Sequence, residues 1–395
     1  MRTPNSKICL GKALALAAAC TATLALAAAH ANAGPTVATG YSLTTFASPF
    51  TVAGLNQGII PGASQVVSAP DDITVAGNSV FIGWGNNVMS DGSDGGQSVV
   101  AQYTLTGQLV NHFNVTGHVE GLAMGNNGLL YTDENEDGNS ALTVINTATG
   151  SQMRYGYPNP SVHGGGFDGL QFINGNLYAS GSNPDNGGDG PGQVNSHPVI
   201  YQVTANPNSY PATATAMGLV WGNDMATNAV TGQTAQMNVF DPDSLNLTPT
   251  GSLLLSNESG AQLTEVTNPG ATQSISVLNL TDASGNPVNT DDTGFATTAH
   301  GTLLFSDVKN NVVYALTANN GFTLNQAYSS DKTNHSLDML NFSTGVLTPI
   351  VTGLGGPAGI GFINDPAAVP EPATLAFIVL AAGGLLLMPR KRVSR

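Results

Sequence analysis

Cysteine is almost absent from this chain of 395 residues, which has only Cys9 and Cys20. Both lie within residues 1–33, where a basic start and an apolar run from Ala13 to Ala29 have the pattern of a secretory signal peptide. Removal of that segment would leave an exported chain without cysteine, which excludes disulfide bonds and cysteine-based catalysis. Its stability then has to come from a hydrophobic core, and the roughly 335 remaining residues are enough for one.

The predicted cleavage point is well defined. Ala31 and Ala33 supply the small side chains that signal peptidase requires, so cleavage is expected before Gly34.

Basic residues are almost as scarce in the exported segment. Between Gly34 and Pro370 the only ones are Arg154, Lys309 and Lys332, against twenty-four acidic residues, a formal net charge of −21. Nucleic-acid binding depends on lysine and arginine at phosphates, so this class of function is excluded. A surplus of carboxylates suits either a solvated extracellular surface or the binding of divalent cations.

Long amphipathic helical patterns are also missing between Gly34 and Asp365. Apolar residues come instead in short runs of about four to seven, rich in β-branched and aromatic side chains and separated by Gly-Asn, Asn-Gly and Asp-Gly turns. The pattern predicts an all-β protein.

An internal repeat narrows the prediction. Each copy has an acidic residue, a short apolar strand, a Gly/Asn turn and a second apolar strand. The copies begin at Asp72, Glu120, Asp168, Asp243 and Asp292, with a last partial copy over 356–363. Further strands follow most copies, and the first three copies start 48 residues apart, which is the length of a four-stranded propeller blade.

We therefore expect a β-propeller of six blades. Its ring would close where an N-terminal strand near Tyr41–Phe46 meets C-terminal strands near Leu347–Ile363. A β-sandwich or a β-solenoid is the alternative, but neither accounts for an acidic residue at the start of each repeat.

The C-terminal residues form a second recognisable segment. A short motif is followed by an uncharged apolar stretch from Thr374 to Met388 and then by a basic tail. The motif consists of Val369, Pro370, Glu371 and Pro372, and the tail contains Arg390, Lys391, Arg392 and Arg395. Fifteen residues are somewhat short for a bilayer span, but the basic flank favours a single transmembrane helix with its C-terminus inside. A buried C-terminal helix is the alternative.

This segment closely resembles the PEP-CTERM sorting signal of Gram-negative bacteria. The resemblance implies export through the inner membrane, transient anchoring by the C-terminal helix and processing by an exosortase near Pro-Glu-Pro. The mature protein would then be at the cell surface or outside the cell. We expect a signal peptide over 1–33, a propeller over 34–365 and a sorting signal over 366–395.

The repeats themselves resemble the blades of phytase-like, gluconolactonase-like and NHL-type propellers. The shared pattern is Asp/Glu-Gly-Leu, a Gly turn, a Leu-Tyr strand and an acidic loop. In a propeller the inner strands start at one rim of the central channel, so the five acidic starts would gather there: Asp72, Glu120, Asp168, Asp243 and Asp292. Clustered carboxylates repel one another unless they are protonated or bridged by a cation, and calcium takes six to eight oxygen ligands. The resemblance implies calcium at this rim. Alternatively, the acids cap strand-entry turns through backbone N–H groups.

A second candidate calcium site is the loop from Asp133 to Gly138. Asp133, Asn135 and Asp137 match the first oxygen ligands of an EF-hand loop, although its later ligands are missing. The alternative is a solvated acidic turn. Asp-rich loops over 91–96 and 185–190 are weaker candidates of the same kind.

Histidine offers the one candidate base. His118 and His163 each precede an acidic start and would face the same rim. No complete catalytic motif is present, so no catalytic residue is assigned. The favoured function is an exported propeller that binds a carbohydrate or protein partner or has a structural role. The alternative is a calcium-dependent hydrolase of lactonase, esterase or phytase-like type.

Overall fold

The computed structural model describes residues 34–55, 65–158, 165–182, 194–270 and 272–365. The regular structure in these ranges consists of β-strands, which confirms the all-β prediction. They contain no helical segment with the length and hydropathy needed to span a bilayer. The predicted signal peptide and sorting helix, 1–33 and 366–395, lie outside the described residues.

The first three blades follow the repeat closely. In each, four antiparallel strands pair in chain order from the channel outward. Blade one has β5 (Pro70–Ala76), β6 (Ser79–Trp84), β7 (Gln97–Thr104) and β8 (Leu109–Thr116). Blade two has β9 (Val119–Met124), β10 (Leu130–Glu134), β11 (Ala141–Ile145) and β12 (Gln152–Gly156). Blade three has β13 (Phe167–Ile173), β14 (Asn176–Gly181), β15 (Pro198–Asn206) and β16 (Thr213–Trp221).

The other three blades carry additions or exchanges. Blade four has β19 (Pro242–Leu247), β20 (Leu253–Asn257), β21 (Gln262–Thr267) and β22 (Ser274–Asn279), extended outward by β17 (Met225–Asn228) and β18 (Thr234–Gln236). Blade five has β23 (Thr290–Phe295), β26 (Ala327–Asp331), β27 (Ser336–Asn341), β28 (Val346–Thr352) and β1 (Thr36–Val37). Blade six has β29 (Pro357–Asn364), β24 (Gly301–Asp307), β25 (Val312–Ala318) and β2 (Tyr41–Ala47). A separate hairpin joins β3 (Thr51–Val52) to β4 (Gln65–Val66).

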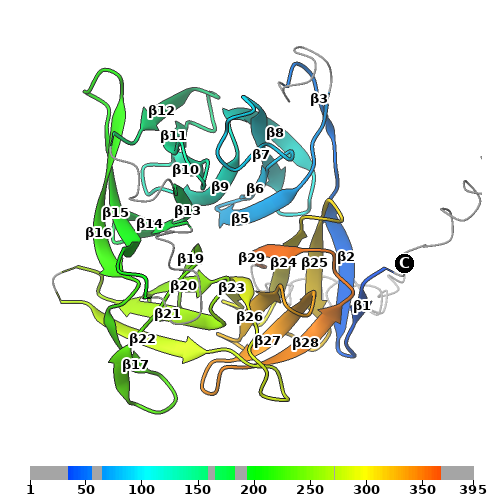
Figure 1. The fold of residues 1–395 in the computed structure, drawn as a ribbon. Helices are drawn as coiled ribbons and strands as arrows, with labels where there is room; N and C mark the ends of the chain where they lie inside the picture. The colour runs from blue at the N-terminus through cyan, green and yellow to red at the C-terminus, as the bar shows by residue number, and fades with distance from the viewer. Residues whose placement is uncertain (1–33, 56–64, 159–164, 183–193, 271, 366–395) are drawn as a thin grey trace, which may run out of the picture. The chain divides into compact units, whose positions relative to one another are not determined.

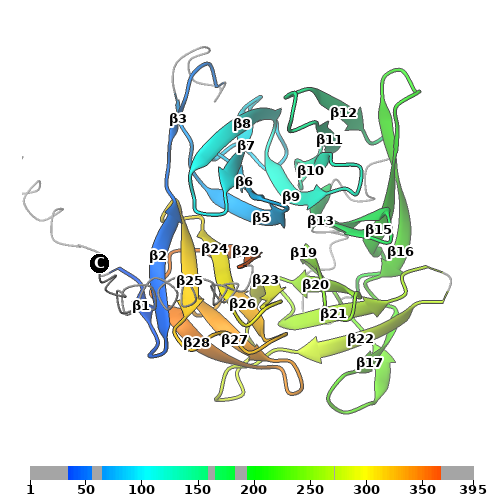
Figure 2. The same cartoon turned by 180° about the vertical axis from the view of Figure 1, so that it is seen from behind.

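The innermost strands form a closed ring. In the order β5, β9, β13, β19, β23 and β29, each contacts the next, and β29 contacts β5 again. Figure 1 shows the sheets arranged in a ring, and Figure 2 shows the same ring from behind. The prediction of a six-bladed propeller is confirmed.

The hydrophobic core of the described residues is divided into six clusters, one between each pair of neighbouring blades. Alternation along the strands explains this division, because successive side chains point to opposite faces of a sheet. In β6, for example, Ile82 and Trp84 pack toward blade six, whereas Phe81 packs toward blade two. Each blade therefore depends on both neighbours for the burial of its two faces.

The prediction that the fifth repeat forms a single unit is wrong. The start at Asp292 lies in β23, which pairs with β26 of blade five. The strand that follows it in the chain, β24, lies in blade six between β29 and β25. Sequence adjacency suggested a hairpin, but the chain crosses to the next blade, and the β24–β25 hairpin forms the middle of the sheet there.

The ring closure also differs in detail. The segment near Tyr41–Phe46 does join the blade that holds β29, but it pairs with β25, for example Leu43 opposite Leu316. A shorter strand upstream of it, β1, makes the contact with a C-terminal strand, with Thr36 opposite Thr352 in β28. Two N-terminal strands thus complete the outer edges of two blades.

The exchange of β24 into blade six can be tested by cross-linking in residues 34–365, which contain no cysteine. Thr302 and Ile363 are direct partners in the β24–β29 ladder, at a separation that suits a disulfide. A Thr302→Cys/Ile363→Cys variant should form an intramolecular disulfide on oxidation, measured by mass spectrometry after proteolysis. The matched pair Thr293→Cys/Leu303→Cys, which would face each other in a simple β23–β24 hairpin, should remain reduced. The reverse result would refute the exchange.

Candidate cation site at the mouth of the channel

A β-bulge recurs at the start of each inner strand. In the sheet of β5, for example, Pro70 pairs with Trp84 but the next pair is Ile73 with Ile82, so three steps along β5 match two along β6. The same shift occurs at the start of the other inner strands. A bulge redirects the side chains of its extra residues. Here the bulge gives the side chains of the second and third residues of each inner strand different directions.

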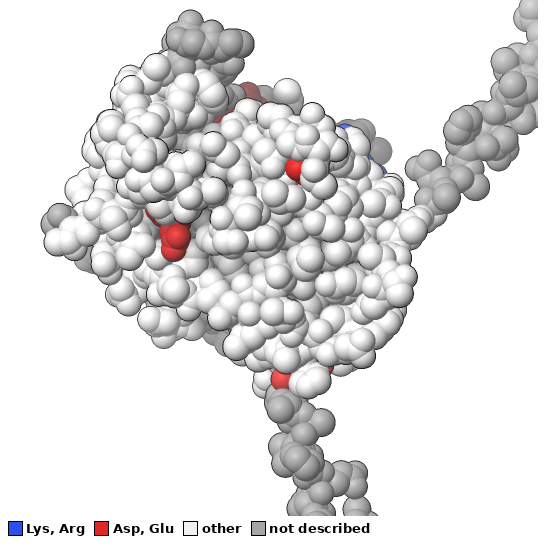
Figure 3. Space-filling view, turned by 90° about the horizontal axis from the view of Figure 1, so that it is seen from below, with Lys and Arg blue, Asp and Glu red and all other residues white. Residues whose placement is uncertain are grey.

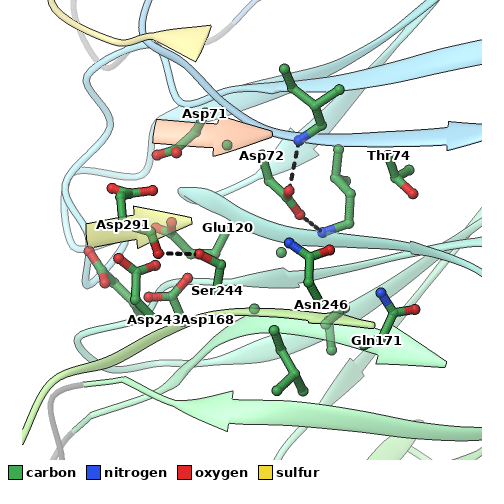
Figure 4. A pocket seen from close by; sticks show the side chains of 18 of the residues that line it. Asp71, Asp72, Thr74, Glu120, Asp168, Gln171, Asp243, Ser244, Asn246 and Asp291 are labelled. Atoms are coloured by element: carbon green, nitrogen blue, oxygen red, sulfur yellow. Dashed lines mark hydrogen bonds between the residues drawn. The ribbon is translucent and has the colours of Figure 1, made fainter. Parts of the chain in front are cut away.

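The second residue of the inner strand is acidic in five of the six blades. These residues are Asp71, Glu120, Asp168, Asp243 and Asp291, and blade six has Ala358 instead. We call the five acids the carboxylate ring. Figure 4 shows their side chains gathered at one end of the channel, in a cavity lined by inner strands of all six blades. The cavity has a volume of about 130 Å³, which suits an ion with its waters better than a large substrate.

The third residue of the inner strand links one blade to the next. Asp72 accepts hydrogen bonds from the backbone N–H groups of Ile73 (2.7 Å) and of Leu122 in blade two. Asp292 accepts one from Ile360 in blade six (2.6 Å). Where this residue is Gly121, an added Cβ would lie 2.4 Å from the Asp168 carbonyl oxygen, so only glycine allows this approach without a shift.

Three of the five acidic starts predicted from the sequence, Glu120, Asp168 and Asp243, therefore lie in the carboxylate ring. Asp72 and Asp292 lie one residue further along, between blades. The sequence analysis missed the residues before them, Asp71 and Asp291. A usable signal was present, because Glu120, Asp168 and Asp243 each stand two residues before a leucine. Asp71 stands in the same way before Ile73.

A second tier of charged residues surrounds the ring where the second strand of a blade ends. Glu136 follows β10, Glu258 follows β20 and Lys332 follows β26. The sequence analysis missed all three, because nothing in their local sequence relates them to the inner strands. Two groups result in which the candidate ligand atoms lie within 4.8 Å of one another: His118, Glu120 and Glu136, and Asp243, Glu258 and Asp291.

Burial and mutual repulsion disfavour ionisation of the acids near blade two. Burial raises the pKa of Glu120 well above its usual range, and the charge of Glu136 adds to this. Burial likewise raises the pKa of Asp168, again with Glu136 as the next cause. Burial and the neighbouring Asp137 raise the pKa of Glu136 to about 7. Protons or a cation are therefore needed to keep these groups together.

Lys332 is the one lysine or arginine among the described residues that line the cavity. Its ammonium forms ion pairs with Glu258 and, at 3.1 Å, with Asp291 Oδ2. Burial alone would lower the pKa of Lys332, but the carboxylates of Asp291, Asp243 and Glu258 raise it overall, so the ammonium stays charged.

The histidines are placed as follows. His118 lies at the cavity, and its Nδ1 contacts Glu120 Oε1. His163 lies outside the described residues.

The predicted loop site at Asp133 has other contacts. Asp133, Asn135 and Asp137 each accept a hydrogen bond from a different group. The donors are the Tyr157 hydroxyl (2.9 Å to Asp133), the His118 backbone N–H (2.8 Å to Asn135) and the Ser90 hydroxyl (to Asp137). Asp133 is fully buried, and burial raises its pKa well above the usual range. These contacts join the segment to other parts of the chain, and calcium binding by the loop stays a prediction.

Of the two weaker candidate loops, one lies within the described residues. In the loop over 91–96, Asp91 accepts a hydrogen bond from the Ser93 backbone N–H (2.9 Å) and Asp94 from that of Gly96 (3.0 Å), which is the pattern of Asx turns. The loop over 185–190 lies outside the described residues.

No family model matches the sequence, and no curated protein matches it. Solved structures with a similar arrangement include virginiamycin B lyase from Staphylococcus aureus, at 12% identity and a TM-score of 0.40, covering 76% of this chain and 85% of that one. The β-propeller domain of Cps50 (Swd1) from Myceliophteria thermophila has 10% identity and a TM-score of 0.43, covering 79% and 90%. A protein provisionally described as a 6-phosphogluconolactonase, from Bacteroides fragilis, has 14% identity and a TM-score of 0.41, covering 77% and 91%. Likenesses this remote assign no activity, and the propeller assignment rests on the closed ring of six sheets.

The raised pKa values predict how stability depends on pH. Burial raises the pKa of Asp72 to about 8 and that of Glu136 to about 7, above the values near 4 of the unfolded chain. The folded protein thus binds more protons than the unfolded one, and its free energy of unfolding falls as pH rises from about 4 to 8. In the presence of a chelator, we expect a higher melting temperature at pH 5.5 than at pH 8.

An Asp168→Asn/Asp243→Asn variant should show a shallower slope over this pH range. Glu265→Gln, which removes a carboxylate of β21 away from the cavity, should leave the slope unchanged. A melting temperature that increases from pH 5.5 to pH 8 would contradict the assignment.

Proposed function

We propose that the protein is an exported, calcium-binding β-propeller that acts as a binding or structural protein at the cell surface or in the extracellular matrix. The observation that carries the proposal is the charge of one small cavity. Eight carboxyl groups line it, and Lys332 is the only lysine or arginine among its described lining residues. Such a group has to be neutralised by protons or by cations, and calcium is the abundant extracellular cation that prefers carboxylate oxygens.

The residues present fit calcium in number and chemistry. Glu120, Glu136 and Asp168 present oxygen ligands from neighbouring blades, and backbone carbonyls or water could complete a shell of six to eight. Magnesium demands a tighter octahedral arrangement and gives up its water reluctantly, so a ring of carboxylates from separate strands suits calcium better.

The ligand of the cavity should be uncharged and polar. Farther along the channel from the carboxylate ring, Thr74, Gln171 and Asn246 present hydroxyl and amide groups (Figure 4). Figure 3 views the molecule from below Figure 1, across the ring and not down the channel, and this outer side is largely free of charged side chains. Hydroxyl groups of a carbohydrate, or a polar protein loop, could bind at such a mouth through calcium and hydrogen bonds.

The proposed partners and location of the protein follow from its predicted export. Signal peptidase would release the chain at Gly34, and an exosortase would act near Pro370, Glu371 and Pro372 after transient anchoring in the inner membrane. The fold is compatible with this order, because all the described strands lie between Thr36 and Asn364 and neither predicted processing site falls within that range of the sequence.

A calcium-dependent hydrolase is the second candidate, and His118 is the observation that favours it. Its imidazole lies beside Glu120 at the cavity, where it could accept a proton from water. Calcium would polarise a carbonyl or phosphoryl oxygen of the substrate. Turnover of lactones or esters that requires calcium and is lost in His118→Ala would support this reading over the binding role.

Calcium titration tests the proposal directly. Residues 34–365 should show calorimetric heat of binding and a rise of several degrees in melting temperature with calcium, because a ligand that binds only the folded state stabilises it. Both effects should be lost in Asp168→Asn/Glu120→Gln and retained in Glu265→Gln. Loss of both effects only in Asp133→Asn would place the site in the loop. If neither the unmodified protein nor any variant shows heat of binding or a shift in melting temperature, calcium binding is refuted.

The sorting signal has a separate test in the source cell. A Pro370→Ala/Glu371→Ala variant should accumulate in the inner membrane, because the C-terminal helix would remain attached. Fractionation followed by immunoblotting would show this, and Asp365→Asn is a matched control next to the motif. Equal release of both variants would argue against exosortase processing.

A further inference from the structure

Lys332 occupies a position that recurs in all six blades. In each blade the residue that follows the second strand donates its backbone N–H to the carbonyl of the residue before the inner strand. The six bonds are Gly85 to Ala69 (2.8 Å), Asn135 to His118 (2.8 Å), Ser182 to Gly166 (3.2 Å), Glu258 to Asp241 (2.8 Å), Lys332 to Asn289 (3.0 Å) and Val308 to Gly356 (2.8 Å). Among these equivalent residues only the one in blade five is a cation.

The turn that carries Lys332 is well supported. Asp331, which precedes it, accepts hydrogen bonds from the backbone N–H (2.7 Å) and the side-chain amide (2.8 Å) of Asn334. The ammonium therefore reaches the cavity from the turn after β26, which these hydrogen bonds hold in place. Its side chain is 38% exposed, so the stem can lie along the surface while the charge stays at the carboxylates.

The ammonium sits on one of the two ligand groups. It contacts Glu258 and Asp291, and the charge of Asp243 acts on it as well. These three residues are the group whose ligand atoms lie within 4.8 Å of one another on the side of blades four and five. A cation thus already occupies this group, and it belongs to the chain itself.

Among the described residues, the other half of the mouth has no such internal cation. Glu120, Glu136 and Asp168 line it there, and His118 is the only basic side chain beside them within the described part of the chain. A divalent ion near Lys332 would be repelled by the ammonium, whereas one near Glu120 would meet several carboxylates without repulsion at close range.

We propose that Lys332 is a built-in cation that fills the Asp243–Glu258–Asp291 group, so that the channel binds one divalent ion, on the side of Glu120 and Glu136. This inference rests on the proposed binding of a cation at the channel mouth. It adds the number of ions and the residue that determines it.

The test is the stoichiometry of calcium binding to residues 34–365, measured by calorimetry. The wild type should bind one calcium ion and Lys332→Met two, because the vacated carboxylates form a second site. Lys332→Arg keeps the charge and should bind one. One ion with unchanged affinity in Lys332→Met, or two in the wild type, would overturn the inference and leave the proposed calcium binding intact.

Two further outcomes separate the hypotheses. If the wild type binds none and Lys332→Met binds one, the proposed function fails but the role of Lys332 stands. If neither binds calcium, both fail.

A second pair of variants keeps the inference testable if Lys332→Met does not fold. Glu258→Gln changes the group that Lys332 fills, so calcium affinity should stay within about twofold. Glu120→Gln changes the group proposed for calcium and should lower affinity at least tenfold. Equal losses in the two variants would overturn the inference.

Discussion

The closed ring is the constraint on which the rest of this structure depends. A sheet with two apolar faces is stable only when both are covered, and here each blade covers one face of each neighbour. Six sheets satisfy this condition only when the sixth blade packs against the first and closes the ring. The ring then brings the starts of six inner strands to one mouth, whatever side chains they carry. The concentration of carboxylates in the cavity is thus a consequence of core packing combined with one acidic residue in each of five repeats.

The carboxylate ring lowers the stability of the fold whose packing brings the acids together. Burial raises the pKa of four of its acids, Glu120, Asp168, Asp243 and Asp291, and so disfavours their ionised forms. The adjoining residue of the strand offsets part of this cost. The carboxylates of Asp72 and Asp292 accept backbone N–H groups of the next blade, and the Ser244 hydroxyl donates to the Asp291 carbonyl oxygen. In blades one, four and five the bulge therefore places a group that stabilises the ring beside one that destabilises it, whereas Gly121, Gly169 and Gly359 hold this position in the other blades. A destabilised, preorganised group of charges of this kind is typical of a functional site.

The exchange between blades five and six shows a second use of the ring. The chain runs from blade five to blade six, back to blade five and again to blade six, while β1 and β2 complete the outer edges of the two sheets. Opening the ring at this point would break several ladders at once. The predicted cleavage before Gly34 leaves only two residues ahead of β1, so export would release a chain whose first residues are part of this closure.

The repeat and its spacing predicted the strand content, the number of blades and the presence of acids at the channel, because short apolar strands with a four-stranded period and an acidic start in each repeat fit a propeller better than a sandwich or a solenoid. The predicted signal peptide and sorting signal rest on the sequence alone, because both lie outside the described residues. Tertiary structure decided which acids face one another. Asp71 and Asp72 are neighbours in sequence with the same chemistry and both line the cavity, but Asp71 belongs to the carboxylate ring, whereas Asp72 accepts the backbone N–H of Leu122 in the next blade. It also decided that β24 leaves its apparent hairpin, and that Glu136, Glu258 and Lys332 meet the ring, because these contacts join residues from different blades and no local pattern relates them.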